Sequence, residues 1–171
     1  MPKIDVIFDK IVIKGDFMRK FLLVLLLSVG VLSGSDDLKK AVFDLTTSSI
    51  NTIESRLIKG VAMNSTYYQD SFKELDVIVV IHGDAYKFFV KDISKTKIKP
   101  DGQLSKNLDD LHQRLKSLTD TYRVKFVMCE AGMKSRDVTK DNILEFVQTI
   151  PSAMMGLIDA QNSGYAFIPV Y

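Results

Sequence analysis

The spacing of hydrophobic positions changes several times along this chain. Hydrophobic residues recur every three or four positions at residues 50–61 and 104–118, which predicts two amphipathic helices. Residues 75–81 are apolar at almost every position and rich in Val and Ile, as in a parallel strand that is covered on both faces. Other short hydrophobic runs predict four more strands, at residues 41–46, 124–129, 147–150 and 165–169.

Polar residues and prolines mark the connections between these elements. Shorter helices are expected at residues 84–90, 140–146 and 152–162, and polar loops at residues 91–102 and 130–139. Pro169 cannot donate a hydrogen bond to a neighbouring strand, so the last strand is predicted to lie at an edge. Strands that alternate with helices indicate an α/β domain, with a mostly parallel sheet and helices on both of its faces.

The N-terminal part has a different pattern. At residues 18–34, the basic residues Arg19 and Lys20 precede an apolar run at residues 21–32, and small residues follow. This order is typical of a secretory signal peptide, and the run is short for a membrane-spanning helix of about 20 residues. We therefore expect residues 18–34 to be removed on export. An uncleaved membrane anchor and a buried core helix are the alternatives.

Residues 1–17 do not fit this interpretation, because a signal peptide begins near the N-terminus. The codons of residues 14–18 can contain a purine-rich ribosome-binding sequence just before an ATG, which favours Met18 as the true start. Residues 1–17 are then an upstream extension, and the alternative is a genuine strand at residues 4–13. The predicted mature protein is one domain, residues 35–171, periplasmic or secreted and without a stable membrane span.

Charge and composition exclude several classes of function. The chain has 171 residues and a net charge of +2, and without residues 1–34 its basic and acidic residues balance. Nucleic-acid-binding domains usually carry a clearly basic face, so we expect no nucleic-acid partner. One Cys and two His do not supply the ligands of a structural zinc site, and we expect no metal. The glycines form none of the common phosphate-binding loops, and we expect no cofactor.

Two predicted strand ends carry candidate chemistry. His82 and Gly83 follow one strand, and Cys129 and Glu130 lie at the end of another. Domains with parallel sheets bind their ligands at the carboxyl edge, where both strand ends are expected. Whether His82 and Cys129 are neighbours there depends on the strand order.

Cys129 has two interpretations from the residues alone. A cysteine beside a loop and a helix N-terminus, with Lys134 and Arg136 close in sequence, can have a lowered pKa and be reactive. The carboxylate of Glu130 would act against that. The other interpretation is a small buried hydrophobic residue. His82 is likewise either a ligand-binding residue or a hydrogen-bonding turn residue. His112 lies beside the leucine stripe of its helix and is expected to be a boundary or surface residue.

Three motifs follow one another in a fixed order along the chain. They are VIVVIHGDAYKFFV (residues 77–90), VKFVMCEAGMKSRDVTKDNI (residues 124–143) and IPSAMMGLIDAQNSGYAFIPV (residues 150–170). Together they resemble the DsrE/DsrF-like family, which has the YchN-like fold, over about residues 41–171. The resemblance implies a flavodoxin-like three-layer sandwich with a mostly parallel five-stranded sheet. It also implies a homo-oligomer, either a trimer or a hexamer.

The resemblance also gives Cys129 a role. In sulfur-relay members of this family, a cysteine after a central strand carries sulfur as a persulfide, and Cys129 is the matching residue. His82 and Gly83 match a recurring pair to which we assign no role. The implied function is an exported protein that binds or carries sulfur on Cys129, with His82, Gly83 and Glu130 at the binding site. Its partners would be sulfur donors or acceptors, either proteins or small molecules.

One feature separates this chain from the sulfur-relay members, which act in the cytoplasm, because residues 18–34 have an export pattern. The sequence therefore leaves open whether the protein is an enzyme. The alternative function is a non-enzymatic, oligomeric protein that binds a small ligand near His82 and has a structural Cys129. A flavin or nucleotide module is the third candidate, and the missing phosphate loops count against it.

Overall fold

Five strands form one sheet in the computed structural model, which describes residues 37–99 and 104–171. Their order across the sheet is β4-β3-β2-β1-β5, and every pairing is parallel. The strands are β1 (Leu38–Leu45), β2 (Glu74–Ile81), β3 (Lys125–Cys129), β4 (Val147–Ile150) and β5 (Ala166–Val170). The expected α/β architecture is therefore confirmed, and the sheet is wholly rather than mostly parallel.

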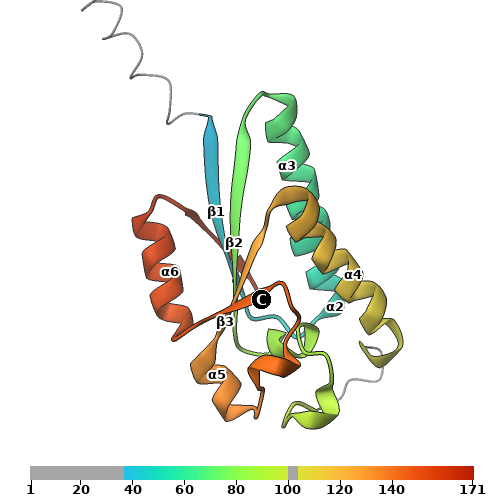
Figure 1. The fold of residues 1–171 in the computed structure, drawn as a ribbon. Coiled ribbons are helices and arrows are strands. Elements are labelled where there is room, and N and C mark those ends of the chain that lie inside the picture. Colours follow the sequence, from blue (N-terminus) through green and yellow to red (C-terminus); the bar gives the residue numbers. More distant parts are fainter. Residues whose placement is uncertain (1–36, 100–103) are drawn as a thin grey trace, which may run out of the picture. The chain divides into compact units, whose positions relative to one another are not determined.

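Helices cover both faces of this sheet (Figure 1). One face carries a continuous helical segment made of α2 (Ile50–Thr52), the π-helical η2 (Ile53–Lys59) and α3 (Gly60–Asp70), with α4 (Leu104–Tyr122) packed beside it. The other face carries α6 (Ala153–Asn162), which contacts four of the strands. The first helical segment is longer than its hydrophobic stripe predicts, because polar residues continue it to Asp70.

The core is built around β2, the middle strand of the sheet. Val79, Val80 and Ile81 are consecutive and fully buried, which the apolar run at residues 75–81 predicts for a strand covered on both faces. By contrast, β5 lies at an edge, as Pro169 indicates, and Phe167 and Ile168 on it are exposed. Burial of the central strands fixes their carboxyl ends, where the candidate residues lie.

Two segments differ from the sequence prediction. Residues 130–139, expected as a polar loop, begin with the helix α5 (Glu130–Ser135) directly after β3. Residues 140–146, expected as a helix, contain only the 3-10 turn η5 (Lys140–Asn142), because Ile143 and Leu144 leave the turn to pack into the core. Two further 3-10 turns, η3 (Ala85–Phe88) and η4 (Ile93–Lys95), follow β2.

The predicted upstream extension, residues 1–17, and the predicted signal peptide, residues 18–34, lie outside the described residues. In residues 37–99 and 104–171, the helices are too short or too polar to cross a membrane. Leu38–Tyr171 forms a compact unit by itself. The expected division of the chain at residue 34 stays a prediction.

Candidate functional site

The carboxyl edge of the sheet brings the candidate residues to adjacent strands. Ile81, at the end of β2, pairs with Leu45 on one side and with Met128 on the other. His82 and Cys129 each follow one of these paired residues, so they lie at the same level on neighbouring strand ends. The strand order thus resolves the question that the sequence left open.

Cys129 is the last residue of β3 and the N-cap residue of α5. Its backbone is extended (φ −72°, ψ 114°), so the chain turns sharply into the helix after it. The sulfur accepts hydrogen bonds from the backbone N–H groups of Gly132, Ala153 and Ala131. These groups belong to the beginnings of two helices, α5 and α6. Ala153 is the first residue of α6, so its N–H has no acceptor within the helix and is available to the sulfur.

The surroundings of the thiol have opposing effects on its pKa. Burial is the largest single influence and raises the pKa, since the side chain is only 7% exposed. The N–H groups of Gly132, Ala153 and Ala131, together with the Tyr86 hydroxyl, stabilise the thiolate and lower the pKa. Their sum outweighs burial, and the pKa of Cys129 lies below that of a free cysteine. The direction is that of a reactive thiol.

Tyr86, on η3, is the residue that sequence reasoning missed. Its side chain is fully buried, and its hydroxyl donates a hydrogen bond of 2.6 Å to the carbonyl oxygen of Cys129. Burial, above all, raises the pKa of the phenol, so it remains a donor at neutral pH. The guanidinium of Arg136 lies 4.8 Å from the centre of its ring. Lys134 and Arg136 are the two basic residues close to the thiol in sequence. Arg136 contacts the ring of Tyr86, which in turn is hydrogen-bonded to the Cys129 carbonyl.

Gly132 is required by the same packing. A Cβ atom at this position would lie 2.1 Å from the hydroxyl oxygen of Tyr86 and 2.7 Å from the ring carbon that bears it. Both distances are far below van der Waals contact, so the helix or the ring would have to shift to admit a side chain. Glycine three residues after the cysteine is the one signal in the sequence that could have pointed to this contact.

His82 bonds to a residue that the sequence analysis did not single out. Its Nε2 lies 2.5 Å from Oδ1 of Asp44, near the end of β1, and both side chains are partly buried. The backbone N–H of His82 also extends the β1–β2 ladder by donating to the Leu45 carbonyl at 3.1 Å. This arrangement fits the hydrogen-bonding turn residue, and the expected ligand-binding role of His82 stays a prediction.

Gly83 serves the backbone of this turn. Its φ of +62° is in the left-handed region, which glycine adopts without strain. An added Cβ would lie 3.1 Å from the Cβ of Thr46, and the next N–H, that of Asp84, donates to the Thr46 carbonyl at 3.2 Å. The expected ligand-binding role of Gly83 therefore stays a prediction, because turn geometry alone accounts for the glycine.

Glu130 forms an ion pair with Lys140 and a hydrogen bond with Thr149. Its carboxylate lies 2.7 Å from the ammonium of Lys140 and accepts a hydrogen bond of 2.7 Å from the hydroxyl of Thr149. These two hydrogen bonds lower the pKa of Glu130, so the carboxylate is ionised. Lys140 balances the negative charge that was expected to oppose a thiolate. The predicted ligand-binding role of Glu130 is not tested by these contacts.

The sequence has a second histidine, His112. His112 is partly buried on α4, beside the leucines of its buried face, which fits the expected boundary residue, and burial lowers its pKa. Its Nε2 is buried without a hydrogen-bond partner in the described part of the chain. Across residues 37–99 and 104–171, His, Cys, Asp and Glu side chains form no cluster suited to a metal ion.

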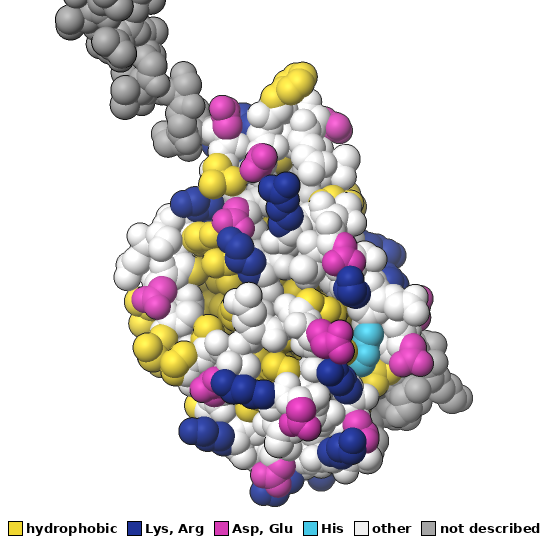
Figure 2. Space-filling model, viewed as in Figure 1, with side chains coloured by type: hydrophobic (Ala, Val, Ile, Leu, Met, Phe, Trp, Pro, Cys, Tyr) yellow, Lys and Arg dark blue, Asp and Glu magenta, His cyan; other side chains and the backbone are white. Residues whose placement is uncertain are grey.

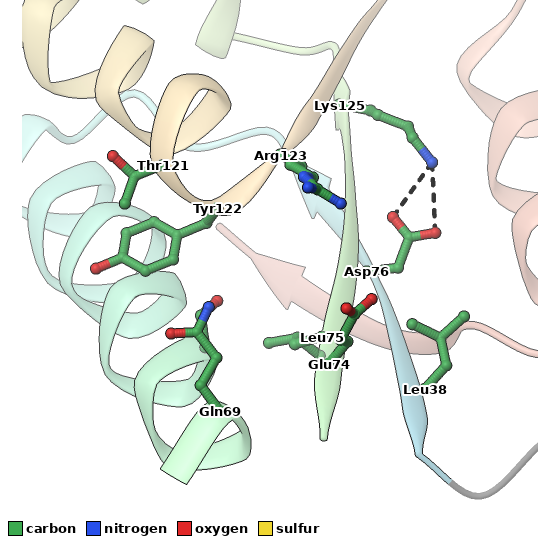
Figure 3. A pocket seen from close by; sticks show the side chains of 10 residues that line it. Leu38, Gln69, Glu74, Leu75, Asp76, Thr121, Tyr122, Arg123 and Lys125 are labelled. Carbon is green, nitrogen blue, oxygen red and sulfur yellow. Dashed lines mark hydrogen bonds and ion pairs between the residues drawn. The ribbon is translucent and has the colours of Figure 1, made fainter. Parts of the chain in front are cut away.

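Pockets lie at the amino ends and at the carboxyl ends of the strands. A pocket of about 460 Å³ opens at the amino edge, where Asp76 pairs with Lys125 beside Arg123 (Figure 3). It is far along the strands from Cys129. A pocket of about 340 Å³ at the carboxyl edge is lined by Tyr86, which bonds to the Cys129 carbonyl, and by Arg136, which lies over the Tyr86 ring.

One surface is notably hydrophobic. Figure 2 shows hydrophobic side chains gathered on the side where α6 lies. On this helix Met154 is 70% exposed, and Met155 and Ile158 are also exposed. Patches of this kind often mark contacts between proteins.

Comparisons with known proteins agree with the fold. The sequence matches the DsrE/DsrF-like family over residues 40–170. It is 28% identical, over 152 residues, to an uncharacterized protein of Aquifex aeolicus (strain VF5). The aligned part is 89% of this chain and 64% of that protein, so the chain spans less than two thirds of its relative.

A solved structure is similar as well. The protein of unknown function MTH1491 from Methanobacterium thermoautotrophicum superimposes with a TM-score of 0.54 and 18% sequence identity. The match covers 77% of this chain and 98% of that protein. At this identity the similarity establishes the fold alone.

Proposed function

Because the chain belongs to the DsrE/DsrF-like family, we propose that it carries sulfur as a persulfide on Cys129. The observation that carries the proposal is the set of N–H groups around the sulfur, from Gly132, Ala153 and Ala131. Such donors stabilise a negative charge on sulfur, whether it is a thiolate or a persulfide anion. A cysteine that served only as core packing would not need them.

The chemistry requires no cofactor. The Cys129 thiolate attacks the outer sulfur of a persulfide donor, R–S–SH, and forms a new S–S bond while the S–S bond of the donor breaks. The donor leaves as the thiolate R–S⁻, and the outer sulfur and its proton end on Cys129. No net oxidation or reduction occurs. An acceptor thiolate takes the sulfur by the same exchange in reverse, and Cys129 returns as a thiolate.

Low exposure of the sulfur favours a second candidate. A side chain that is 7% exposed is also what a structural cysteine would have, beside a ligand held near His82. This second function is a non-enzymatic binding protein. The two functions differ in one property, since only the carrier needs a thiol that reacts in the folded protein.

The test is to expose the folded protein to a small persulfide or polysulfide and to record its intact mass. We expect the mass of one added sulfur atom on the wild type and its loss after treatment with a reducing thiol. Cys129→Ser is the matched control, because Cys129 is the one cysteine of the sequence. A wild-type mass that stays unchanged until the protein is denatured would support the binding protein instead.

We also propose where and in what form the protein acts. The signal-peptide pattern of residues 18–34 supports export to the periplasm or outside the cell. The exposed hydrophobic side chains of Met154, Met155 and Ile158 support a homo-oligomer, with the trimer or hexamer that the family resemblance implies. A sulfur donor or acceptor would then meet an assembled particle.

A further inference from the structure

We propose that the pocket at the carboxyl edge, between α5 and the loop after η4, binds a small oxyanion of the phosphate, sulfate or thiosulfate type. Its volume of about 340 Å³ is at the lower end of the range of small-molecule sites, roughly 300–1,000 Å³. It lies at the edge where α/β domains bind their ligands. The proposal does not depend on sulfur transfer by Cys129.

The charges around this pocket favour an anion. Its lining contains four basic side chains against one acidic side chain, Asp84; the basic residues are Lys87, Lys97, Lys99 and Arg136. One further carboxylate is close, since Asp137 pairs with Lys97 at 3.0 Å. Both partners of that pair are mostly exposed, so water screens it, and the lining keeps an excess of positive charge.

Arg136 is the best placed of these groups. It is partly buried, and its guanidinium donates to the carbonyl of Gly132 at 3.4 Å and to the hydroxyl of Ser135 at 3.2 Å. In the described residues no carboxylate forms an ion pair with it. A partly buried guanidinium with neutral partners retains its charge and its planar set of donors for an oxyanion.

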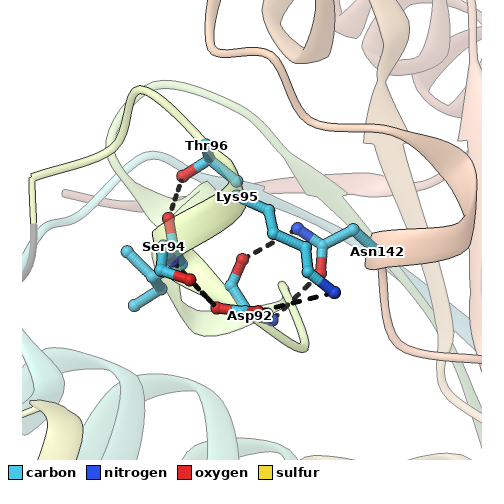
Figure 4. A network of polar contacts seen from close by, with 6 residues as sticks. Asp92, Ser94, Lys95, Thr96 and Asn142 are labelled. Carbon is cyan, nitrogen blue, oxygen red and sulfur yellow. Dashed lines mark hydrogen bonds and ion pairs between the residues drawn. The ribbon is translucent and has the colours of Figure 1, made fainter.

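The loop that supplies Lys97 and Lys99 is held in place. Its beginning is fixed by the buried side chain of Asn142, which donates to the Asp92 carbonyl at 2.8 Å and accepts from the Asp92 N–H at 3.0 Å (Figure 4). Its end is fixed by the N–H of Lys97, which donates to the carbonyl of Arg136 at 2.8 Å. The lysine and the arginine are therefore brought together by the fold before any ligand arrives, which reduces the entropic cost of binding.

The position of the pocket gives it a role beside the thiol. Arg136 and Tyr86 line it, and the hydroxyl of Tyr86 bonds to the carbonyl of Cys129. Only the ring of Tyr86 would separate an anion bound to Arg136 from Cys129. Thiosulfate would bring sulfur to this edge, whereas phosphate would occupy the same site without any sulfur to transfer.

The test is calorimetric titration of the full chain with inorganic phosphate and, separately, with thiosulfate at low salt. We expect saturable binding of one anion per chain that weakens as salt is added. Arg136→Gln should raise Kd at least about tenfold, since hydrogen bonds to charged groups are stronger than neutral ones. Lys97→Gln, an exposed change that leaves the fold intact, should raise Kd as well. Lys95→Gln is the control, because Lys95 pairs with Asp92 and does not line the pocket.

The outcomes separate this site from the thiol. Binding of both anions that persists in Cys129→Ser and is lost in Arg136→Gln supports an oxyanion site. Binding of thiosulfate alone with the same response to these two variants supports a site selective for sulfur oxyanions. The proposal is overturned if neither anion saturates, if Arg136→Gln and Lys97→Gln bind as the wild type does, or if Cys129→Ser abolishes binding.

Discussion

Replacing Gly132 by alanine tests the packing that surrounds Cys129. Gly132 lies inside α5, and the added methyl group would lie 2.1 Å from the hydroxyl oxygen and 2.7 Å from Cζ of Tyr86. Because Tyr86 is fully buried, the ring cannot turn away into solvent. Either α5 or the ring must shift. The helix follows Cys129 directly in the chain, and the ring is held to the Cys129 carbonyl by a hydrogen bond.

The magnitude follows from three contributions. Alanine is favoured over glycine inside a helix by about 0.5–1 kcal/mol. Overpacking of a buried site costs about 1–3 kcal/mol. Loss of the hydrogen bond from Tyr86 to the Cys129 carbonyl costs about 0.5–1.5 kcal/mol more. Together these give a fall in the free energy of unfolding of Gly132→Ala of about 2 kcal/mol, within a range of about 0.5–4 kcal/mol.

The assay is equilibrium unfolding in urea, with Gly60→Ala as the matched control. Gly60 also lies within a continuous helical segment, but an added Cβ there meets its nearest neighbour, the carbonyl oxygen of Ser55, at 3.6 Å. The free energy of unfolding of Gly60→Ala should therefore rise by about 0.5–1 kcal/mol, because alanine has the higher helix propensity. In Gly132→Ala, alkylation of the thiol at neutral pH should also slow, because the Gly132 N–H moves away from the sulfur.

A different result would refute this reasoning. If Gly132→Ala is as stable as Gly60→Ala and its thiol reacts at the wild-type rate, then Tyr86 does not hold the backbone of Cys129 in place. The double variant Tyr86→Phe, Gly132→Ala gives a second check. Without the hydroxyl the closest contact disappears, so Gly132→Ala should cost less stability in this background than in the wild type.

Three further predictions concern the rest of the molecule. Burial, then the hydrogen bond and charge of Asp76, raise the pKa of Tyr165 from 10.0 to about 12. The stability from this raised pKa is complete below pH 10 and is lost as the pH rises towards 12, so Tyr165→Phe should flatten that part of the denaturation profile. Light scattering should show a trimer or hexamer, which Met154→Lys disrupts and the equally exposed Met63→Lys does not; a wild-type monomer would remove the proposed assembly. The intact mass of the protein from its native host should match a chain that begins near Gly34 or Ser35. A product that retains residues 18–34 would contradict export.

Local patterns were sufficient to predict the sheet. The consecutive apolar residues of β2 and the short runs of the other strands are properties of neighbouring positions, which a sequence displays directly. Cys129 and His82 were placed at the carboxyl edge for the same reason, since each follows a strand. The order of the strands is not a local property, and the structure was needed to show that β2 and β3 are neighbours.

The contacts that define the site were harder to predict. Tyr86 is 43 residues away from Cys129, and Asp44 is 38 residues away from His82. No periodicity connects such pairs. The helix α5 was missed because its sequence is polar and contains Gly132, a poor helix former. It is stabilised by tertiary packing, since Met133 is buried and the missing Cβ of Gly132 makes room for Tyr86.

The most direct test of the sulfur-carrier proposal is the pH dependence of alkylation of Cys129 in the folded protein. The thiolate is the nucleophile, so the rate follows its fraction. We predict a midpoint below about 8.5, the pKa of a free cysteine, and a rise towards that value when urea unfolds the chain. A thiol that stays unreactive at every pH until the protein unfolds would contradict the proposal and leave Cys129 a structural residue.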